Sequence, residues 1–210
     1  MFVPKLYRNE NREEMFAFIS ENNFGILVSQ NDQGIPIASH IPFFSRLVDD
    51  GIVLTSHMSK SNEQWQNLET IEEVLVIFQG PHSYISSSWY DHVNVPTWDY
   101  IAVHLYGKAH ILKHDETLLH LNDLVNKHEA AETQPISLDT MTIGYVEKEM
   151  KGLVAFEIKV SRTFSAFKLS QNRDRKNIDK IIVELEKRHD ENSLAIANAL
   201  KKINQVSSDD

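Results

Sequence analysis

The chain of 210 residues contains no cysteine, which excludes disulfides, thiolate nucleophiles, zinc fingers and iron–sulfur clusters. No apolar run is long enough to span a membrane, and the first ten residues, MFVPKLYRNE, lack the apolar core of a secretory signal. We therefore expect a cytoplasmic protein. Hydrophobic residues make up 41% of the chain, which is enough for one main domain with helical additions.

Positive charge is also scarce. The formal net charge is -9, and residues 1–170 contain 13 Lys+Arg against 22 Asp+Glu, whereas residues 171–210 contain 8 of each. Proteins that bind DNA normally present a basic face that displaces counterions from the phosphates. The sequence therefore gives only weak support for binding to a DNA operator.

Strand patterns dominate the first 112 residues. A short helix is expected over residues 12–21, with Asn11 as its cap. The segments GILVSQ, PIASHIPFF and IVLTSH then follow, separated by the turns NDQG and DDG, which predicts a three-stranded antiparallel meander. A short helix over Ser61–Leu68 follows. The strands VLVIFQ and DYIAVHLYGKA then flank the polar, aromatic connection GPHSYISSSWYDHVNVPTW. Five strands at this density predict a small barrel.

The second half is mainly helical around one more strand, LVAFEIKV. We expect a helix capped by Asp115, a helical segment over Leu138–Met150, and a C-terminal helical hairpin. The first of these helices has Leu118, Leu121, Val125 and His128 on one face, and the hairpin has the apolar stripes Ile178, Ile181, Ile182 and Leu185, then Leu194, Ala197 and Leu200. The fold class is α+β with a mainly β core, divided into a domain of residues 1–170 and a helical extension of residues 171–210.

The segment LTSHMSKSNEQW is the best candidate for an anion site. It places hydroxyl side chains and Lys60 between a strand and a helix start, where unpaired backbone N–H groups and the helix dipole attract negative charge. A monophosphate is the sharpest hypothesis. The alternative is that Ser59 or Ser61 caps the helix while the ammonium group of Lys60 is solvated.

Five motifs carry a resemblance to a known family: IPIASHIPF, LTSHMSKSNEQW, VLVIFQGPHSYISSSWY, NVPTWDYIAVHLYG and KLSQNRD. They resemble the PaiB-type FMN-binding negative transcriptional regulators, a group of split β-barrel flavoproteins typified by pyridoxamine-phosphate oxidase. The resemblance runs from residue 1 to about residue 205. It implies a homodimeric, antiparallel split β-barrel of the FMN-binding type, with peripheral helices and FMN at the subunit interface.

By this resemblance, several side chains would contact FMN. The phosphate would face Ser59, Lys60, Ser61 and Asn62, the ring edge would face Thr55 and Ser56, and the ring plane would face Ile37, Ala38, Ser39 and His40. Split-barrel oxidases commonly have two consecutive basic residues at the phosphate and one on the preceding strand, whereas Pro36 and Ile41 are not basic here. Arg173 is the candidate for the compensating cation, since an arginine can bind phosphate bidentately; the alternative is an ion pair with Asp174 or Asp179.

Histidines and tryptophans provide further candidates. His104, His110 and His114 cluster in the sequence, but no carboxylate completes a ligand pattern such as HExxH, so we expect no metal site. A neutral His40 could donate to a flavin oxygen or bond to backbone. Trp89 and Trp98 are candidates for the mouth of a cofactor site, whereas Trp65 is expected in the core.

Two functional classes follow. The resemblance implies an FMN-binding repressor of genes for protease synthesis and sporulation. The alternative is an FMN-dependent oxidoreductase of the pyridoxamine-phosphate-oxidase-like class that acts on an unknown small molecule. A flavin-binding module without chemistry is a third reading. Whether the protein is an enzyme, and on what substrate or operator it acts, is left open by the sequence.

Overall fold

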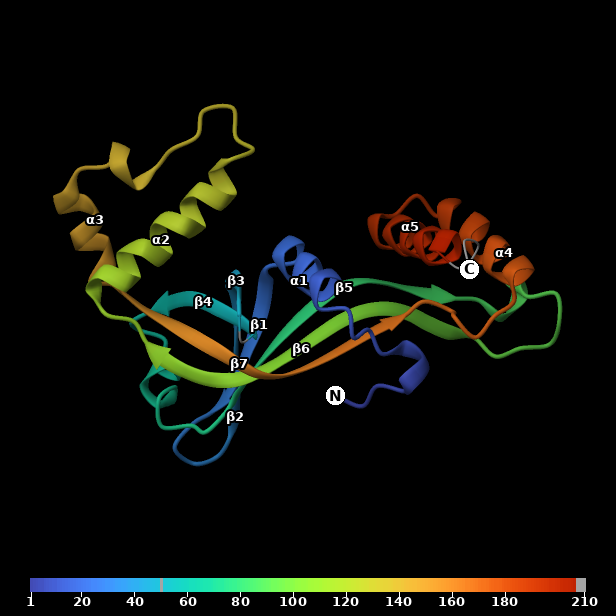
Figure 1. Ribbon diagram of the computed structural model, residues 1–210, viewed down its shortest axis with the longest axis horizontal. Helices are drawn as coiled ribbons and strands as arrows, with labels where there is room; N and C mark the ends of the chain where they lie inside the picture. Colours follow the sequence, from blue (N-terminus) through green and yellow to red (C-terminus); the bar gives the residue numbers. More distant parts are fainter. Residues whose placement is uncertain (50, 207–210) are drawn as a thin grey trace. The chain divides into compact units, whose positions relative to one another are not determined.

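The computed structural model describes residues 1–49 and 51–206, and Figure 1 shows how its elements follow one another. Residue 50, in the predicted DDG turn, and residues 207–210, at the end of the predicted extension, lie outside this description. The strands are β1 (Phe24–Gln30), β2 (Pro36–Pro42), β3 (Phe44–Val48), β4 (Gly51–Ser59), β5 (Val74–Ile85), β6 (Thr97–Ile111) and β7 (Leu153–Lys168). The α-helices are α1 (Arg12–Glu21), α2 (His114–Glu129), α3 (Ile143–Met150), α4 (Arg175–Glu186) and α5 (Glu191–Val206), and the 3-10 helices are η1 (Lys5–Tyr7), η2 (Glu63–Asn67), η3 (Ser87–Trp89) and η4 (Leu138–Thr140).

Within the described residues, the seven strands form one sheet in the order β2-β1-β5-β6-β7-β4-β3. The pairings of β1 with β2 and β5, of β3 with β4, and of β4 with β7 are all antiparallel. The β1–β2 turn is fixed by Asn31, whose side-chain oxygen accepts from the N–H groups of Gln33 and Ile35, and by Gly34 at φ +76. This is the NDQG turn that the sequence predicts.

The predicted meander is wrong, because PIASHIPFF is two strands. Pro42 has no N–H and ends β2. The next residue, Phe43, is buried with its ring centroid 5.5 Å from that of Phe78. The chain then starts β3, which pairs with β4, so that β2 and β3 lie at opposite ends of the strand order. Residues 1–112 accordingly contain six strands rather than the predicted five.

Two compact units make up the chain, and the long strands β5, β6 and β7 run through both. Unit 2 consists of residues 16–78 and 104–163, and unit 1 consists of residues 1–15, 79–103 and 164–210. The core of unit 2 lies on the sheet, where the fully buried side chains include Leu27, Leu54, Phe78, Phe156 and Ile158. The core of unit 1 lies between α4 and α5, where Ile181, Leu185, Ile196, Ala197 and Leu200 are buried. The predicted helical hairpin is therefore confirmed.

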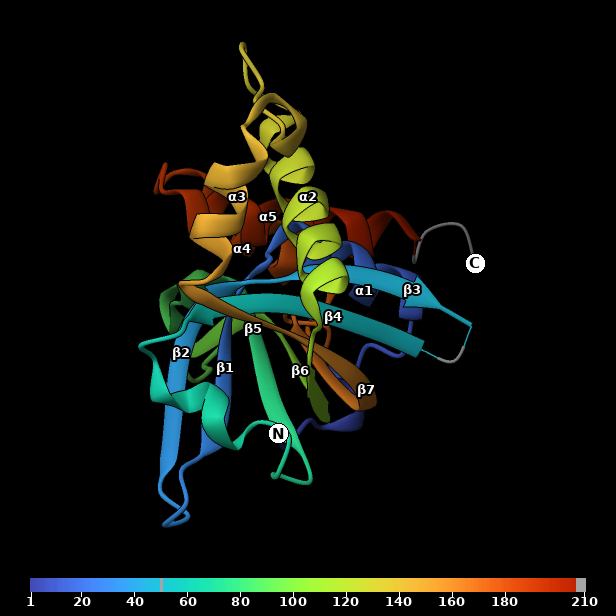
Figure 2. The ribbon, with the colours of Figure 1, turned by 90° about the vertical axis from the view of Figure 1, so that its left-hand side faces the viewer.

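The helix α2 belongs to unit 2 and lies beside α3 (Figure 2). Its start and its buried face differ from the prediction. It begins one residue before Asp115, after Lys113, whose N–H donates to the carboxylate of Glu116 at 2.8 Å. The residues that it buries are Thr117, His120 and Leu124, not the predicted stripe that starts at Leu118. The predicted helix over 138–150 is divided into η4 and α3.

Candidate functional site

The loop between β4 and η2 contains the residues predicted to bind phosphate, Ser59 to Asn62. Its backbone N–H groups are not unpaired, contrary to the prediction. Those of Lys60 and Asn62 donate to the carbonyl oxygens of Gly152 and Ser59 at 2.8 and 2.9 Å. The N–H of Ser61 donates to the hydroxyl oxygen of Ser59 at 3.3 Å. The helix that follows is only the five-residue η2, so a phosphate at this loop would be held mainly by side chains.

The side chains of this loop divide into two groups. Ser59, Lys60 and Ser61 are exposed. Asn62 is half-buried and joins the loop to β2, because its amide nitrogen donates to the hydroxyl of Ser39 at 2.8 Å while its oxygen accepts from the N–H of Gln64 at 3.1 Å. The ammonium group of Lys60 and the hydroxyl of Ser61 are therefore the groups that remain accessible to an anion.

Two side chains of η2 form hydrogen bonds that stabilise the loop. Gln64 is buried, and its amide nitrogen donates to the carbonyl oxygen of Leu27 at 3.1 Å and to the hydroxyl of Ser29 at 2.9 Å. The half-buried Trp65 donates its indole N–H to the carbonyl oxygen of Lys60 at 3.0 Å. These bonds fix the backbone of the loop, so that the Lys60 side chain starts from a defined position.

The strand β2, which the loop contacts through Ser39, has one exposed face. Ala38 and His40 are exposed, whereas Ile37 and Ser39 are half-buried on the opposite face. The His40 ring lies 6.5 Å, centroid to centroid, from the ring of Phe24, which is 66% exposed, and the two planes are tilted by 31°. An exposed aromatic pair of this kind is a surface on which a flat heterocycle can stack. The sequence reasoning missed Phe24, although Phe24-Gly25 marks the start of β1.

The two hydroxyl residues predicted at the ring edge, Thr55 and Ser56, are both buried and already bonded. The Ser56 hydroxyl donates to the carbonyl oxygen of Pro42 at 2.6 Å. The Thr55 oxygen lies 2.9 Å from Nδ1 of His120. Either hydroxyl would have to break a bond within the protein before it could contact a flavin.

A histidine pair lies beyond Thr55, with His120 buried and His57 half-buried, and the sequence reasoning missed it. Nδ1 of His57, on β4, is 3.0 Å from Nε2 of His120, on α2, so one N–H lies between the two rings. Burial lowers the pKa of His57, and burial with the neighbouring His57 and Arg46 lowers the pKa of His120 to about 4. The chain from Thr55 through His120 to His57 is therefore uncharged at neutral pH. Its signal in the sequence is weak: a polar residue every second position on β4.

The predicted tryptophans Trp89 and Trp98 belong to unit 1. The Trp89 ring is covered by the guanidinium of Arg188, with 4.6 Å between its carbon and the ring centroid. Trp98 is exposed and stacks edge-to-face with Tyr84, with 5.9 Å between ring centroids. Trp98 is the one of these two with an accessible ring face.

Arg173 is also in unit 1, and neither predicted ion pair forms. Asp179 pairs with Arg175 at 3.2 Å, and Asp174 accepts from the N–H of Asn177 at 2.9 Å as the cap of α4. The guanidinium of Arg173 lies over the Tyr90 ring, 5.0 Å from its centroid. Its Nε is buried and has no hydrogen-bond partner among the described residues. Of the charged groups nearby, the buried carboxylate of Asp99 interacts electrostatically with this arginine.

Asp99 lies in the same part of unit 1 and is fully buried. One carboxylate oxygen accepts from the hydroxyl of Ser170 at 2.7 Å, and the other has no partner in the described part of the chain. Burial raises the pKa of Asp99 to about 6, and Ser170 and Lys168 oppose this rise. Ser170 itself has φ 54, a left-handed conformation that is uncommon outside glycine. Asp99 therefore holds a strained turn immediately before α4.

Replacement of Asp99 by asparagine is expected to stabilise the protein at pH 8 by about 2 kcal/mol, since the ionised carboxylate is disfavoured by burial. The raised pKa means that this group contributes stability below its unfolded pKa of 3.8, and that the contribution is lost as pH rises through about 6. Melting temperatures at pH 5 and pH 8 measure the effect, with Asp32→Asn on the exposed β1–β2 turn as the control. A wild-type chain more stable than Asp99→Asn at pH 8 would contradict it.

The antiparallel sheet with its peripheral helices defines a split β-barrel. Solved structures with this fold include the FAD and heme binding protein from Mycobacterium smegmatis, with TM-score 0.60 and 17% identity over 82% of this chain and 79% of that one. The flavocytochrome Anf3 from Azotobacter vinelandii gives TM-score 0.60 and 12% identity over 82% and 75%. At these identities the likeness concerns the fold alone.

The chain belongs to the PaiB-type family of FMN-binding domains, since a family model described as "Putative FMN-binding domain" matches residues 1–162. It is 42% identical over 201 residues to "Protease synthase and sporulation protein PAI 2" of Bacillus subtilis, covering 96% of this chain and 97% of that protein. A second relative, an uncharacterized protein of Emericella nidulans, is 29% identical over the same shares of the two chains. The family resemblance of the five sequence motifs is thereby confirmed.

No helix in the described part of the chain is both long and apolar enough to cross a membrane.

Proposed function

We propose that this protein binds FMN, and that it uses bound FMN to regulate genes for protease synthesis and sporulation. The observation that carries the FMN site is the exposed Lys60 on a loop whose backbone is hydrogen-bonded to Gly152, Ser59 and Trp65. Lys60 and Ser61 would hold the phosphate, and the face of β2 with Ala38, His40 and the neighbouring Phe24 would support the ring. The name of the 42% identical relative refers to protease synthesis and sporulation, and the regulation of genes is what the family resemblance implies.

Bound FMN supplies one- and two-electron redox chemistry, and the residues of this chain bind and orient it. We also propose a homodimer with FMN at the subunit interface and a cytoplasmic location, as the family resemblance implies. Arg173, with its unpartnered Nε, is the second candidate cation for the phosphate. Trp98 is the candidate aromatic residue of unit 1 for the mouth of the cofactor site.

The charge distribution favours a second candidate, an FMN-dependent oxidoreductase. With 22 acidic against 13 basic residues in positions 1–170, the chain has little positive charge for DNA phosphates. A direct repressor should bind operator DNA with an affinity that falls steeply with salt, whereas an oxidoreductase should reduce its flavin with a nicotinamide cofactor and reoxidise it with an acceptor. Absence of DNA binding together with flavin turnover would favour the second candidate.

The FMN site is tested by reversing the charge of Lys60. We expect Lys60→Glu to weaken FMN binding about tenfold or more, because a dianion then meets a negative instead of a positive side chain. Quenching of flavin fluorescence measures the affinity. Riboflavin, which has no phosphate, should bind equally well to the variant and the wild type.

Lys108→Glu, an exposed lysine of β6, is the matched control for net charge. An equal loss of FMN affinity in Lys60→Glu and Lys108→Glu would show a nonspecific charge effect. If Lys60→Glu leaves the affinity for FMN unchanged, the phosphate does not bind at this loop. Arg173→Glu would then be the next variant to measure.

A further inference from the structure

The outer surface of α2 has an apolar patch where a surface helix is normally polar. Leu118 and Leu119 are 37% and 53% exposed, whereas the polar residues Thr117 and His120 face the sheet and are buried. Each exposed leucine forgoes the stabilisation that burial of an apolar side chain provides, roughly 25 cal/mol per Å². These two leucines therefore form an apolar surface that no other described element covers completely.

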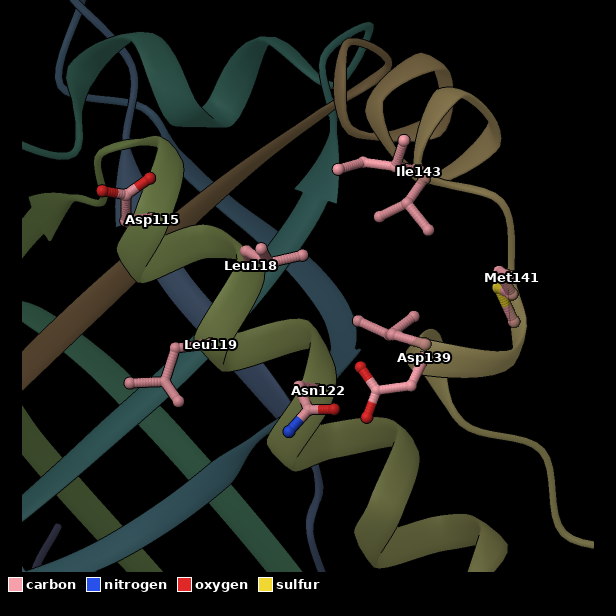
Figure 3. A pocket seen from close by; sticks show the side chains of 9 residues that line it. Asp115, Leu118, Leu119, Asn122, Asp139, Met141 and Ile143 are labelled. Atoms are coloured by element: carbon pink, nitrogen blue, oxygen red, sulfur yellow. The ribbon is translucent and has the colours of Figure 1, made fainter.

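A second apolar wall faces the leucines. It comes from η4, α3 and the residues between them, and its most exposed member is Ile143 at 81%. Figure 3 shows Leu118 of α2 and Ile143 of α3 pointing toward the same space. Met141 lies on the segment between η4 and α3. All of these residues belong to unit 2, so their arrangement is fixed within that unit.

The space between these walls, which we call the α2–α3 groove, has a volume of about 540 Å³. This size lies in the range of small-molecule sites, about 300–1,000 Å³, and such sites are mostly apolar with a few placed polar groups. The polar residues that line the groove are Asp115, Asn122 and Asp139. Neither lysine nor arginine lines it.

The two carboxylates differ in their surroundings. Asp115 accepts from Nδ1 of His114 at 3.0 Å. The Asp139 side chain has no hydrogen bond or ion pair in the described part of the chain, and Figure 3 shows its carboxylate directed toward Asn122 of α2. An uncompensated carboxylate beside apolar walls is complementary to a ligand that combines a positive charge with a hydrophobic body.

We propose that the α2–α3 groove binds a small hydrophobic amine. The ammonium group would pair with Asp139, and the alkyl or aryl body would lie between Leu118 and Ile143. The groove lies outside the loop, β2 face and unit 1 residues assigned to FMN, so the proposal does not depend on FMN binding. A neutral hydrophobic ligand, an anionic one and a second copy of this chain are the competing occupants.

Three probes of nearly equal shape separate charge from hydrophobicity: 4-phenylbutylamine, 4-phenylbutanol and 4-phenylbutyrate. At neutral pH they are cationic, uncharged and anionic. We expect isothermal titration with the full chain to give the tightest binding for the amine, at least fivefold tighter than for the alcohol, with the acid weakest. Equal affinity for all three probes, or a preference for the acid, would overturn the proposal.

Variants then locate the ammonium group and the hydrophobic body. Asp139→Asn should lower the affinity for the amine to that for the alcohol. Ile143→Ser should weaken the binding of the amine and of the alcohol by the same factor. Both positions are exposed, so neither change removes a core contact. Glu149→Gln, on the exposed part of α3 outside the groove, removes the same charge and should change neither affinity.

Two results with these variants would refute the site. The first is an amine affinity that Asp139→Asn leaves unchanged. The second is a concentration-dependent dimer in sedimentation that Ile143→Ser dissociates and the amine does not affect, because the groove would then be covered by a second copy of the chain.

Discussion

Substitution of Gly107 by alanine is expected to destabilise the protein by on the order of 3 kcal/mol, the upper end of the range for overpacked positions. A Cβ atom at position 107 would lie 2.3 Å from the carbonyl oxygen of Lys159 and 2.8 Å from a methyl carbon of Ile158. These positions belong to β6 and β7, which are neighbours in the sheet. A backbone oxygen cannot turn away as a flexible side chain can, so one of the two strands must shift.

Unfolding by urea, followed by circular dichroism, measures this loss. Gly144→Ala is the matched control, because nothing lies within 4 Å of a Cβ atom at position 144, in the first turn of α3. Alanine there should be neutral or should stabilise the helix by about 0.5–1 kcal/mol. Comparable stability of Gly107→Ala and the wild type would mean that β6 and β7 do not approach so closely.

The same position shows what a sequence can and cannot predict about this fold. The alternation of apolar residues predicts the strands, and the helical spacing around Ile181 and Ala197 predicts the C-terminal hairpin, because both patterns are local. The close approach at Gly107 is not local, since it depends on which strand becomes the neighbour. The break at Pro42 was missed for a related reason: a proline at the end of a strand pattern gives no information about where the next strand pairs.

The helix α2 is a case in which periodicity predicts the helix and misassigns its buried face. A stripe of leucines starting at Leu118 suggests a buried side, yet the sheet beneath α2 presents Thr55 and His57, and the polar His120 matches them. Hydrogen bonding thus determines the orientation of the helix, and Leu118 is turned toward the α2–α3 groove. A pattern of hydrophobicity alone cannot predict the hydrogen bonds that His120 makes with Thr55 and His57.

For the candidate FMN site, the sequence identifies the loop but not its hydrogen bonds. Lys60 is exposed, as an anion site requires, and it lies in the predicted strand-to-helix connection. The N–H groups of the loop donate to the carbonyl oxygens of Gly152 and Ser59. Gly152 is about 90 residues away in the chain, so the sequence does not reveal this contact. Thr55 and Ser56 look like available hydroxyls in the sequence, and only the structure shows that both have protein partners.

The pair of His57 and His120 leads to the second large effect, a loss of stability in mild acid. His120 is 3% exposed, and its pKa of about 4 in the folded chain lies well below the ordinary value of 6.5. The groups that face it are His57 on β4, Arg46 on β3, Glu157 on β7, and Glu116 and Asp123 on α2. Only His57 and Arg46 among them lower the pKa of His120, in addition to burial.

Because the folded-state pKa is depressed, the stabilisation from neutral His120 is present above pH 6.5 and is lost as pH falls through about 4. The loss amounts to on the order of 3 kcal/mol when the unfolded chain binds the proton and the folded chain does not. Protonation of His120 would bury a positive charge near Arg46, and protonation of His57 as well would place two N–H groups between the rings and break the bond that attaches α2 to β4.

Replacement of His120 by glutamine should remove this pH dependence, because the amide still donates to Nδ1 of His57 but does not titrate. We expect the variant to be about 1 kcal/mol less stable than the wild type at pH 7.5 and more stable at pH 4.5. Urea unfolding at the two pH values measures the free energy of unfolding of both proteins. The control is His110→Gln, which removes an exposed imidazole from β6 and should leave the pH dependence of the stability as it is in the wild type. Parallel curves for His120→Gln and the wild type would show that the pair does not control acid stability.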